Sequence, residues 1–334
     1  MKHVAILGAG SWGTAIAKHL AEQGYPTRLW ARRPSLAASM REDGENAGYL
    51  RGFPLPEALE PTSELVEAVQ GAQAVFFVVP SHGLRELARE VAPLLSPDVP
   101  VVSATKGIEN DTLMLMTDVL EQELGPRVGD RLAALAGPSF AREVAAGMPT
   151  AVSVGSRHGT TARMVQELVA GDRFRAYTTE DVVGLELGGA LKNVIAIAAG
   201  AADGLGFGHN ARAGLITRGV AEISRLATHL GANPQTLAGL SGMGDLVLTC
   251  TGDLSRNRMV GMELGRGRPL DEVLGEMTMV AEGVRTAKSA HALAQREGVD
   301  MPITAEVYAA LYEGKPPMDA VQSLLSRSLR PERD

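Results

Sequence analysis

Residues 4–17 read VAILGAGSWGTAIA, a short apolar run that stops at a glycine and resumes with apolar residues at helical spacing. This pattern predicts a strand, a tight turn and a helix, with G-x-G-x-x-G in the turn. Gly8 permits the sharp turn, Gly10 lets a pyrophosphate approach the backbone, and Gly13 lets the helix pack closely on the strand. Strand-like residues 27–31 follow at βαβ spacing. The stretch predicts dinucleotide binding, with a structural glycine turn as the alternative.

Two arginines end the second expected strand, where dinucleotide folds place the residue that contacts the adenosine ribose. A carboxylate at this place would accept from the 2′-hydroxyl of NAD. The chain has Arg32 and Arg33 instead, and guanidinium groups pair with a 2′-phosphate. The pair therefore favours NADP(H), with NAD(H) as the alternative cofactor. A solvated basic turn is the competing interpretation.

Strand-like and helical segments alternate up to about residue 180. Residues 44–62 are rich in glycine and proline, which predicts an irregular excursion. Strands are expected at 74–79, 99–104, 132–136, 151–154 and 174–177, with helices at 84–95 and 113–124 among the connections. This alternation predicts the α/β class, with a doubly wound parallel sheet of the Rossmann type. Ligands bind such sheets beyond the carboxyl ends of the strands.

The character of the sequence changes near residue 181. Strand-like runs disappear, and helical periodicity covers residues 182–203, 211–230, 254–266, 286–297, 305–313 and 318–326. We therefore expect two domains. Residues 1–180 would form a dinucleotide-binding domain of the Rossmann type, and residues 181–334 an all-helical substrate-binding domain.

Composition narrows the class of protein. The net charge of −7 argues against a nucleic-acid partner held by phosphate contacts. Cys250 is the only cysteine, which excludes an intrachain disulfide and suits a cytoplasmic protein. The first expected strand leaves no room for a signal peptide, and the apolar stretch at 193–202 is too short to span a bilayer, so we expect no membrane insertion. The seven histidines lack paired metal spacing, so no metal is expected.

Lysine usage points to the chemistry. Only six of the 32 basic residues are lysines. Lys192 lies in LKNVIAIA, a segment whose apolar flanks predict burial, and desolvation lowers the pKa of a lysine toward a range useful for proton transfer. Lys192 is therefore the candidate acid and base, with a lysine that extends to the surface as the alternative.

Further candidates lie near expected strand ends and helix starts. Lys106 follows a strand in SATKG and could bind an anion or polarise a carbonyl, unless it is an ordinary loop lysine. A glycine-rich turn at 242–246 leads to the Ser-Arg-Asn of residues 255–257, which suits the binding of an oxyanion. A capped helix with a solvated arginine is the alternative there. Cys250 has no thiolate-stabilising neighbour in sequence, which favours a small buried residue over a nucleophile.

An ordered set of motifs resembles the bacterial-type NAD(P)-dependent glycerol-3-phosphate dehydrogenases. The set covers nearly the whole chain and comprises GAGSWGTA (8–15), LWAR (29–32), ATKGIE (104–109), AGPSFA (136–141), LKNV (191–194), GLG (204–206) with Asn210, GDL (244–246), and TC (249–250) leading to SRNR (255–258). The resemblance implies reversible reduction of dihydroxyacetone phosphate to sn-glycerol 3-phosphate for phospholipid synthesis. It also implies a small phosphorylated substrate and a homodimer.

The resemblance assigns roles position by position. Lys192 would be the catalytic proton acceptor in oxidation and the donor in reduction. The substrate would be bound by Lys106, Gly137, Ser139, Lys192, Asn193, Asp245, Ser255, Arg256 and Asn257. The cofactor would be bound by Gly8, Gly10, Ser11, Trp12, Gly13, Arg32, Arg33, Lys106, Ala141, Arg256, Val280 and Glu282.

Two other functions remain compatible with these residues. A reductase of a small keto or hydroxy acid, of the ketopantoate or hydroxyisobutyrate type, also combines a nucleotide domain with a helical domain and a lysine. A non-catalytic NADP-sensing module would bind the nucleotide without turnover. The identity of the substrate distinguishes the two reductases, and the effect of replacing Lys192 distinguishes an enzyme from the sensing module.

Overall fold

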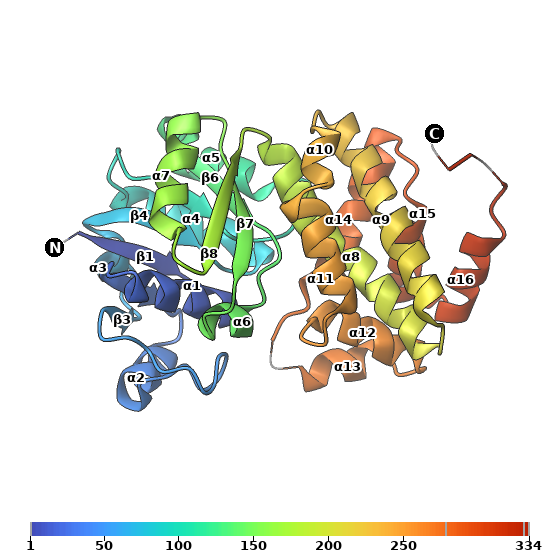
Figure 1. Ribbon diagram of the computed structural model, residues 1–334, viewed down its shortest axis with the longest axis horizontal. Helices are drawn as coiled ribbons and strands as arrows, with labels where there is room; N and C mark the ends of the chain where they lie inside the picture. The colour runs from blue at the N-terminus through green and yellow to red at the C-terminus, as the bar shows by residue number, and fades with distance from the viewer. Residues whose placement is uncertain (1, 278, 330, 333–334) are drawn as a thin grey trace.

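A computed structural model describes residues 2–277, 279–329 and 331–332, and Figure 1 shows a sheet-bearing half beside a helical half. The eight strands run in the order β3-β2-β1-β4-β5-β6-β7-β8. Their bounds are β1 (His3–Leu7), β2 (Thr27–Trp30), β3 (Leu59–Thr62), β4 (Ala72–Phe77), β5 (Val101–Ser103), β6 (Leu132–Ala136), β7 (Thr150–Gly155) and β8 (Phe174–Thr179). The sheet and its helices confirm the predicted α/β class.

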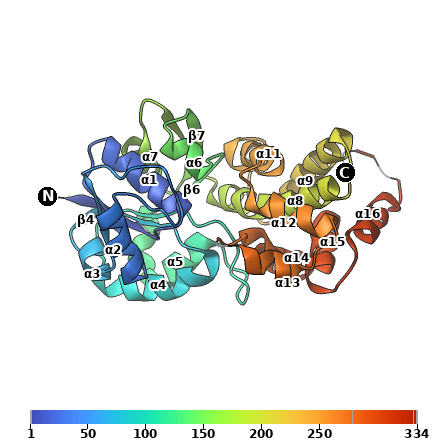
Figure 2. The same ribbon diagram turned by 90° about the horizontal axis from the view of Figure 1, so that it is seen from below.

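Helices cover both faces of the sheet. They are α1 (Ser11–Glu22), α2 (Pro34–Asp43), α3 (Leu65–Val69), α4 (Leu84–Val91), α5 (Met116–Leu124), α6 (Ala141–Ala145) and α7 (Gly159–Val169). Figure 2 shows α1, α6 and α7 on one face and α3, α4 and α5 on the other. Successive residues of a strand point to opposite faces, so Ile6 packs toward the first group while Ala5 and Leu7 pack toward the second. The buried strands hold the glycine turn rigidly at the sheet's carboxyl edge.

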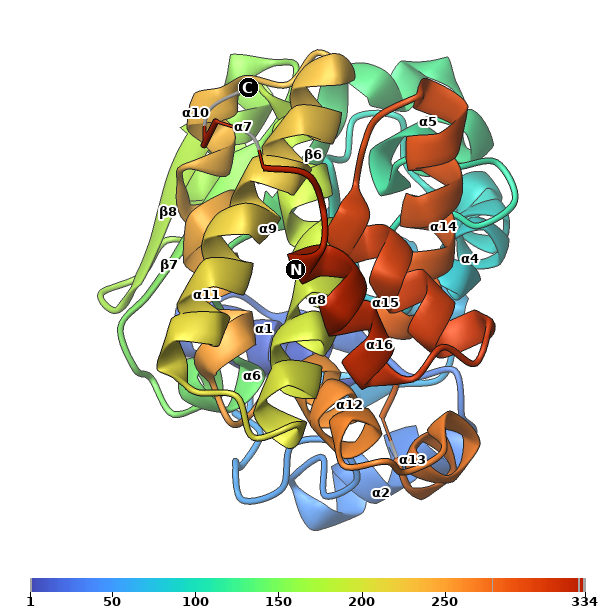
Figure 3. The ribbon, with the colours of Figure 1, turned by 90° about the vertical axis from the view of Figure 1, so that its right-hand side faces the viewer.

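The helical half is built around α8 (Val182–Gly204). Its other helices are α9 (His209–His229), α10 (Pro234–Leu237), α11 (Asp245–Thr251), α12 (Arg256–Gly265), α13 (Leu270–Glu276), α14 (Glu282–Glu297), α15 (Pro302–Tyr312) and α16 (Pro317–Leu325). Figure 3 shows α8 enclosed by its neighbours, and it contacts α9, α11, α12, α14 and α15. Helix α8 is apolar and long enough to cross a membrane. However, 89% of its most apolar 18-residue stretch is buried inside the protein. It is the core helix of this half.

Glycines allow α12 to lie against α8. A Cβ on Gly200 would come within 2.0 Å of the Arg258 carbonyl oxygen, and a Cβ on Gly261 within 2.0 Å of the Ile197 carbonyl oxygen. Larger residues at either position would push the two backbones apart. This close packing sets where the start of α12, which carries Arg256, lies relative to Lys192.

Several local predictions were wrong. Residues 59–62 of the expected irregular excursion form β3, an edge strand parallel to β2 that tolerates Pro61. Strand β7 is antiparallel to β6, so the sheet is not entirely parallel. Helix α5 begins at Met116 rather than at Leu113, because Leu113 has a φ of 60° and cannot continue a helix.

The glycine-rich turn of the helical half also differs from expectation. Residues Leu240–Gly244 form a single π-helical turn that runs directly into α11. Glycine is needed at 242 because a Cβ there would lie 2.0 Å from the Leu237 carbonyl oxygen. The turn places Asp245 at the start of a buried helix rather than in a loop.

Candidate active site

The glycine turn leaves the start of α1 open on one side. Gly8 has a φ of +126°, and a Cβ on it would lie 2.3 Å from the Val78 carbonyl oxygen. A Cβ on Gly13 would lie 1.8 Å from the Gly8 carbonyl oxygen. A Cβ on Gly10 would meet nothing within 4 Å. The first two glycines are therefore required by the fold, whereas the space beside Gly10 can receive a phosphate at a helix N-terminus.

Side chains around this turn join it to its surroundings. Ser11 Oγ donates to the Tyr49 carbonyl oxygen at 2.7 Å and lies 3.0 Å from Met279 Sδ in the helical half. Arg33 Nη2 donates to Tyr49 Oη at 3.0 Å, and Arg32 beside it is exposed. The indole N–H of Trp12 is buried without a partner among the described residues. Arg32 and Arg33 both lie at the surface, where an anion could reach their guanidinium groups.

Asn46 is a residue of this region that the sequence analysis missed. It is fully buried, and its Nδ2 donates to the Ala9 carbonyl oxygen at 3.0 Å and to Thr14 Oγ1 at 2.8 Å. These bonds fasten the excursion at 44–62 to the glycine turn. No local motif marks Asn46, because its partners come from a different part of the sequence.

Two lysines and one carboxylate form the centre of the site. Lys192 on α8 and Lys106 after β5 share Asp245, which begins α11. Lys106 Nζ lies 2.9 Å from Asp245 Oδ2, and Lys192 Nζ is hydrogen-bonded to Asp245 Oδ1. Lys192 Nζ also donates to Thr249 Oγ1 at 3.0 Å, a contact that the sequence analysis did not foresee. Lys192 and Asp245 are 6% and 1% exposed, so their charges are shielded from water.

Burial changes the proton affinity of Lys192. Its pKa lies at about 7, lowered from 10.5 chiefly by desolvation. The Asp245 carboxylate opposes this shift, and the Lys106 ammonium reinforces it. Burial raises the pKa of Cys250 to about 12, so its thiol stays protonated and is no nucleophile. Lys192 can therefore gain or lose a proton near neutral pH.

An asparagine pair lies beside Lys192. Asn257 Nδ2 donates to Asn193 Oδ1 at 2.9 Å, and Asn257 Oδ1 accepts from the Gly283 N–H at 2.9 Å. The Asn193 oxygen is thereby occupied, which leaves the Asn193 N–H groups as donors to a ligand. Ser255 is the N-cap of α12 and accepts from the Arg258 N–H.

Arg256 and Glu282 come from the starts of α12 and α14. Desolvation lowers the pKa of Arg256, an effect that Glu282 opposes. Burial also raises the pKa of Glu282, whose Oε2 accepts from Ser81 Oγ at 2.8 Å. Among the described residues, no hydrogen bond or ion pair occupies the Arg256 guanidinium. It is a partly buried cation available to an anionic ligand.

The remaining predicted residues lie at the end of β6 and in the segment before α14. The Gly137 carbonyl oxygen accepts from Lys106 Nζ at 3.4 Å and from Ser139 Oγ at 3.0 Å. Ala141 begins α6, and Val280 is 41% exposed. Within the described ranges, no group of three or more His, Cys, Asp or Glu residues could hold a metal ion.

A chain of contacts joins the glycine turn to the lysines. Val78 packs against Gly8, and the next residue, Val79, accepts from Thr105 Oγ1 at 2.9 Å. Thr105 immediately precedes Lys106, which contacts Asp245 and through it Lys192. The contacts follow the carboxyl ends of β4 and β5, so they connect the glycine turn to side chains of the helical half at this edge of the sheet. The arrangement can bind a dinucleotide and exchange a proton with a small anionic ligand.

Comparison with known proteins identifies the family. The models for the N-terminus and C-terminus of NAD-dependent glycerol-3-phosphate dehydrogenase match residues 3–162 and 181–322. The glycerol-3-phosphate dehydrogenase [NAD(P)+] of Geobacter metallireducens is 55% identical, covering 99% of this chain and 98% of that protein. A crystal structure of the enzyme from Coxiella burnetii is 42% identical with a TM-score of 0.93, covering 98% of this chain and 99% of that one. The chain belongs to the NAD-dependent glycerol-3-phosphate dehydrogenase family.

Proposed function

We propose that this protein catalyses the reversible reduction of dihydroxyacetone phosphate to sn-glycerol 3-phosphate with NAD(P)H, and so supplies the glycerol phosphate backbone of phospholipids. The observation that carries the proposal is the buried Lys192, hydrogen-bonded to Asp245 and Thr249 beside Lys106. Family membership supports the same reaction.

Lys192 exchanges the proton. NAD(P)H, when bound, supplies a hydride to the ketone carbon. The carbonyl oxygen then takes a proton from Lys192 Nζ, and in the reverse reaction the neutral amine of Lys192 takes the hydroxyl proton back. An ammonium has three N–H donors, of which Asp245 and Thr249 occupy two, so the third is left for the substrate oxygen. A pKa near 7 allows both directions.

The phosphate and the carbonyl are bound by different groups. Arg256 pairs with the phosphate, helped by Ser255 at the start of α12. Lys106 and the Asn193 N–H groups stabilise the oxygen as negative charge develops on it. Asn257 holds Asn193 in the donating orientation, and Gly137 and Ser139 lie next to Lys106.

The cofactor would be held at the sheet edge. The space beside Gly10 would receive its pyrophosphate, and Gly8, Ser11, Trp12 and Gly13 shape that turn. Arg32 and Arg33 bind the 2′-phosphate, which favours NADP(H) over NAD(H). The remaining cofactor contacts would come from Lys106, Ala141, Arg256, Val280 and Glu282.

The two proposed domains correspond to the two binding tasks, one for the cofactor and one for the substrate. Residues 1–180 form the dinucleotide-binding domain and residues 181–334 the substrate-binding domain. We propose a homodimer formed through the helical domain, in the cytoplasm, with neither nucleic acid nor a metal in the reaction.

An initial-rate assay tests the function. NADPH should be consumed with dihydroxyacetone phosphate, and more slowly when NADH replaces it. Turnover with ketopantoate but not with dihydroxyacetone phosphate would establish the rival reductase. Nucleotide binding without any turnover would establish a sensing module.

A further inference from the structure

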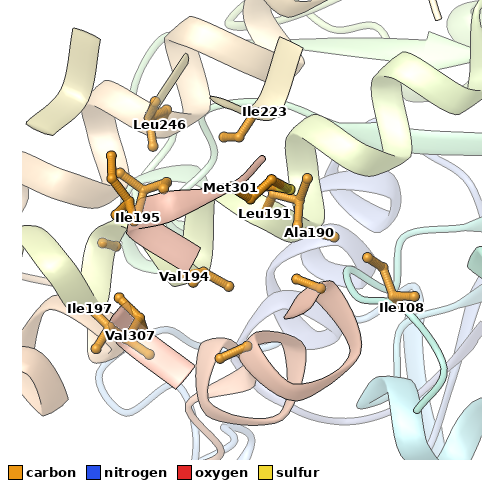
Figure 4. Packing of buried hydrophobic residues seen from close by; sticks show 14 of the residues in the cluster. Ile108, Ala190, Leu191, Val194, Ile195, Ile197, Ile223, Leu246, Met301 and Val307 are labelled. Carbon is orange, nitrogen blue, oxygen red and sulfur yellow. The ribbon is translucent and has the colours of Figure 1, made fainter. Parts of the chain in front are cut away.

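Residues 106–115, here called the bridging loop, reach from the end of β5 into the helical half (Figure 2). Ile108 and Leu115 are 2% and 9% exposed and belong to the core cluster of the helical half. Figure 4 shows Ile108 beside Ala190 and Leu191 of α8. The two ends of the loop pair as an antiparallel bridge between Ile108 and Leu115. The loop is thus a closed turn that inserts into the other half.

Arg85 of α4 fixes this loop from outside the substrate site. Its Nε and Nη2 donate to the two carboxylate oxygens of Glu109 at 2.8 and 2.7 Å. Arg85 Nη1 also donates to Gln122 at 2.8 Å and to Glu123, both on α5. The side chains of Arg85 and Glu109 are 18% and 14% exposed. Partial burial and two parallel bonds make this pair more rigid than an exposed pair such as Arg28–Glu60.

The anchored residue is close to Lys106 along a backbone with little freedom. Only Gly107 and Ile108 separate Lys106 from Glu109. Gly107 has a φ of +156°, and a Cβ there would lie 2.7 Å from Ser81 Cβ. Ile108 is fixed in the helical core. Ile108 and Glu109 are therefore two anchors of the segment that carries Lys106, and release of Glu109 removes one of them.

We propose that Arg85 and Glu109 are positioning residues that hold Lys106 against Asp245, and thereby set the electrostatic environment of Lys192. Neither residue touches the Lys106–Asp245–Lys192 cluster itself. The inference rests on the proposed function, because its effect is measured through turnover of dihydroxyacetone phosphate.

The pH profile distinguishes positioning from a merely structural role. The charged groups that face Lys192 are Asp245 on α11 and Lys106 in the bridging loop, and the nearby Cys250 thiol is neutral. The Lys106 ammonium lowers the pKa of Lys192. If Lys106 moves away from Asp245, the pKa of Lys192 rises, and the decline of kcat with pH in the reductive direction moves to higher pH.

The experiment compares Glu109→Gln and Arg85→Lys with Arg89→Ala. Arg89 is the control because it pairs with Glu123 on the same surface and, among the described residues, makes no hydrogen bond or ion pair with the bridging loop, on which it acts only through a longer-range attraction to Glu109. We expect kcat/KM for dihydroxyacetone phosphate to fall about tenfold or more in the first two variants. The KM for NADPH should change less. The decline of kcat with pH in the reductive direction should move to higher pH. Arg89→Ala should behave as the wild type.

Two results would overturn the inference. One is a folded Glu109→Gln or Arg85→Lys variant with the kcat, KM and pH limb of the wild type. The other is an equal loss in Arg89→Ala, which would mean that any damage to this surface lowers activity. If Glu109→Gln does not fold, Arg85→Lys decides alone, because it keeps the positive charge but loses the two parallel bonds to Glu109 and the Nη1 bonds to Gln122 and Glu123 on α5. Wild-type turnover, measured in the same series, tests the proposed function separately.

Discussion

The glycine turn and the lysine cluster are two kinds of candidate site near the same edge of the sheet. The turn uses residues 8–13, which are contiguous, and depends on backbone shape and empty space. The cluster joins Lys106 to Asp245 across 139 positions of sequence and buries charges of both signs. Binding of a dinucleotide thus depends on local geometry, whereas proton transfer depends on burial that only the complete fold supplies.

This difference between the two sites predicts which kinetic quantity a substitution in each of them should change. A change in the turn should alter cofactor affinity and leave the chemical step intact. A change in the cluster should alter the chemical step and leave cofactor affinity intact.

The largest effect is expected for Lys192→Ala. Loss of the proposed proton donor should lower kcat about a thousandfold, which is within the range for removal of a general acid. NADPH binding, measured by fluorescence titration, should stay within about twofold of wild type. Lys288→Ala, which removes an exposed lysine of α14, is the matched control. A Lys192→Ala variant with nearly normal kcat would exclude this lysine from the mechanism.

A smaller effect is expected for Arg256→Ala. Removing a partly buried guanidinium that pairs with phosphate should raise the KM for dihydroxyacetone phosphate about thirtyfold. Arg266→Ala is the control, since Arg266 is an exposed arginine paired with Glu263. An unchanged KM in steady-state assays would assign the phosphate to another group.

Gly10→Ala tests whether this glycine is needed for cofactor binding rather than for folding. A Cβ at this position meets nothing in the protein, so the unfolding transition should change little, while a methyl group in the pyrophosphate space should raise the KM for NADPH about tenfold. Gly214→Ala, on the exposed side of α9, also meets nothing and should leave the KM unchanged. A wild-type KM in Gly10→Ala would place the pyrophosphate elsewhere.

The smallest expected effect concerns the pH dependence of stability and comes from Glu186, a second buried ionisable group on α8. Glu186 accepts from the Thr117 N–H and hydroxyl, and burial raises its pKa to about 7 from 4.5. The folded state therefore holds this proton more tightly, and its stabilising contribution is complete below pH 4.5 and lost as pH rises through about 7.

Glu186→Gln should remove this dependence, because glutamine resembles the neutral acid. Relative to wild type, the free energy of unfolding of the variant should rise by on the order of 2 kcal/mol between pH 4.5 and 8, measured by urea denaturation. Glu272→Gln, at an exposed position of α13, is the control. A constant difference between variant and wild type across this range would show that Glu186 is ionised throughout.

The sequence predicted what depends on local pattern. The glycine turn, the alternating strands and the apolar helix around Lys192 follow from spacing, and the structure contains all three. The missed features depend on distant partners. Asn46 has its role only beside Ala9 and Thr14, and the first turn of α5 is bound through Thr117 by Glu186 of another segment. Strand β3 needs β2 beside it to form a ladder.

The pH dependence of kcat in both directions tests the account most directly. In the proposed mechanism reduction needs the ammonium of Lys192, so its kcat should fall as pH rises through about 7. Oxidation needs the neutral amine, so its kcat should rise over the same range. Two limbs that bend in the same direction, or that stay level from about pH 6 to 9, would contradict the role of Lys192 as the group that exchanges the proton.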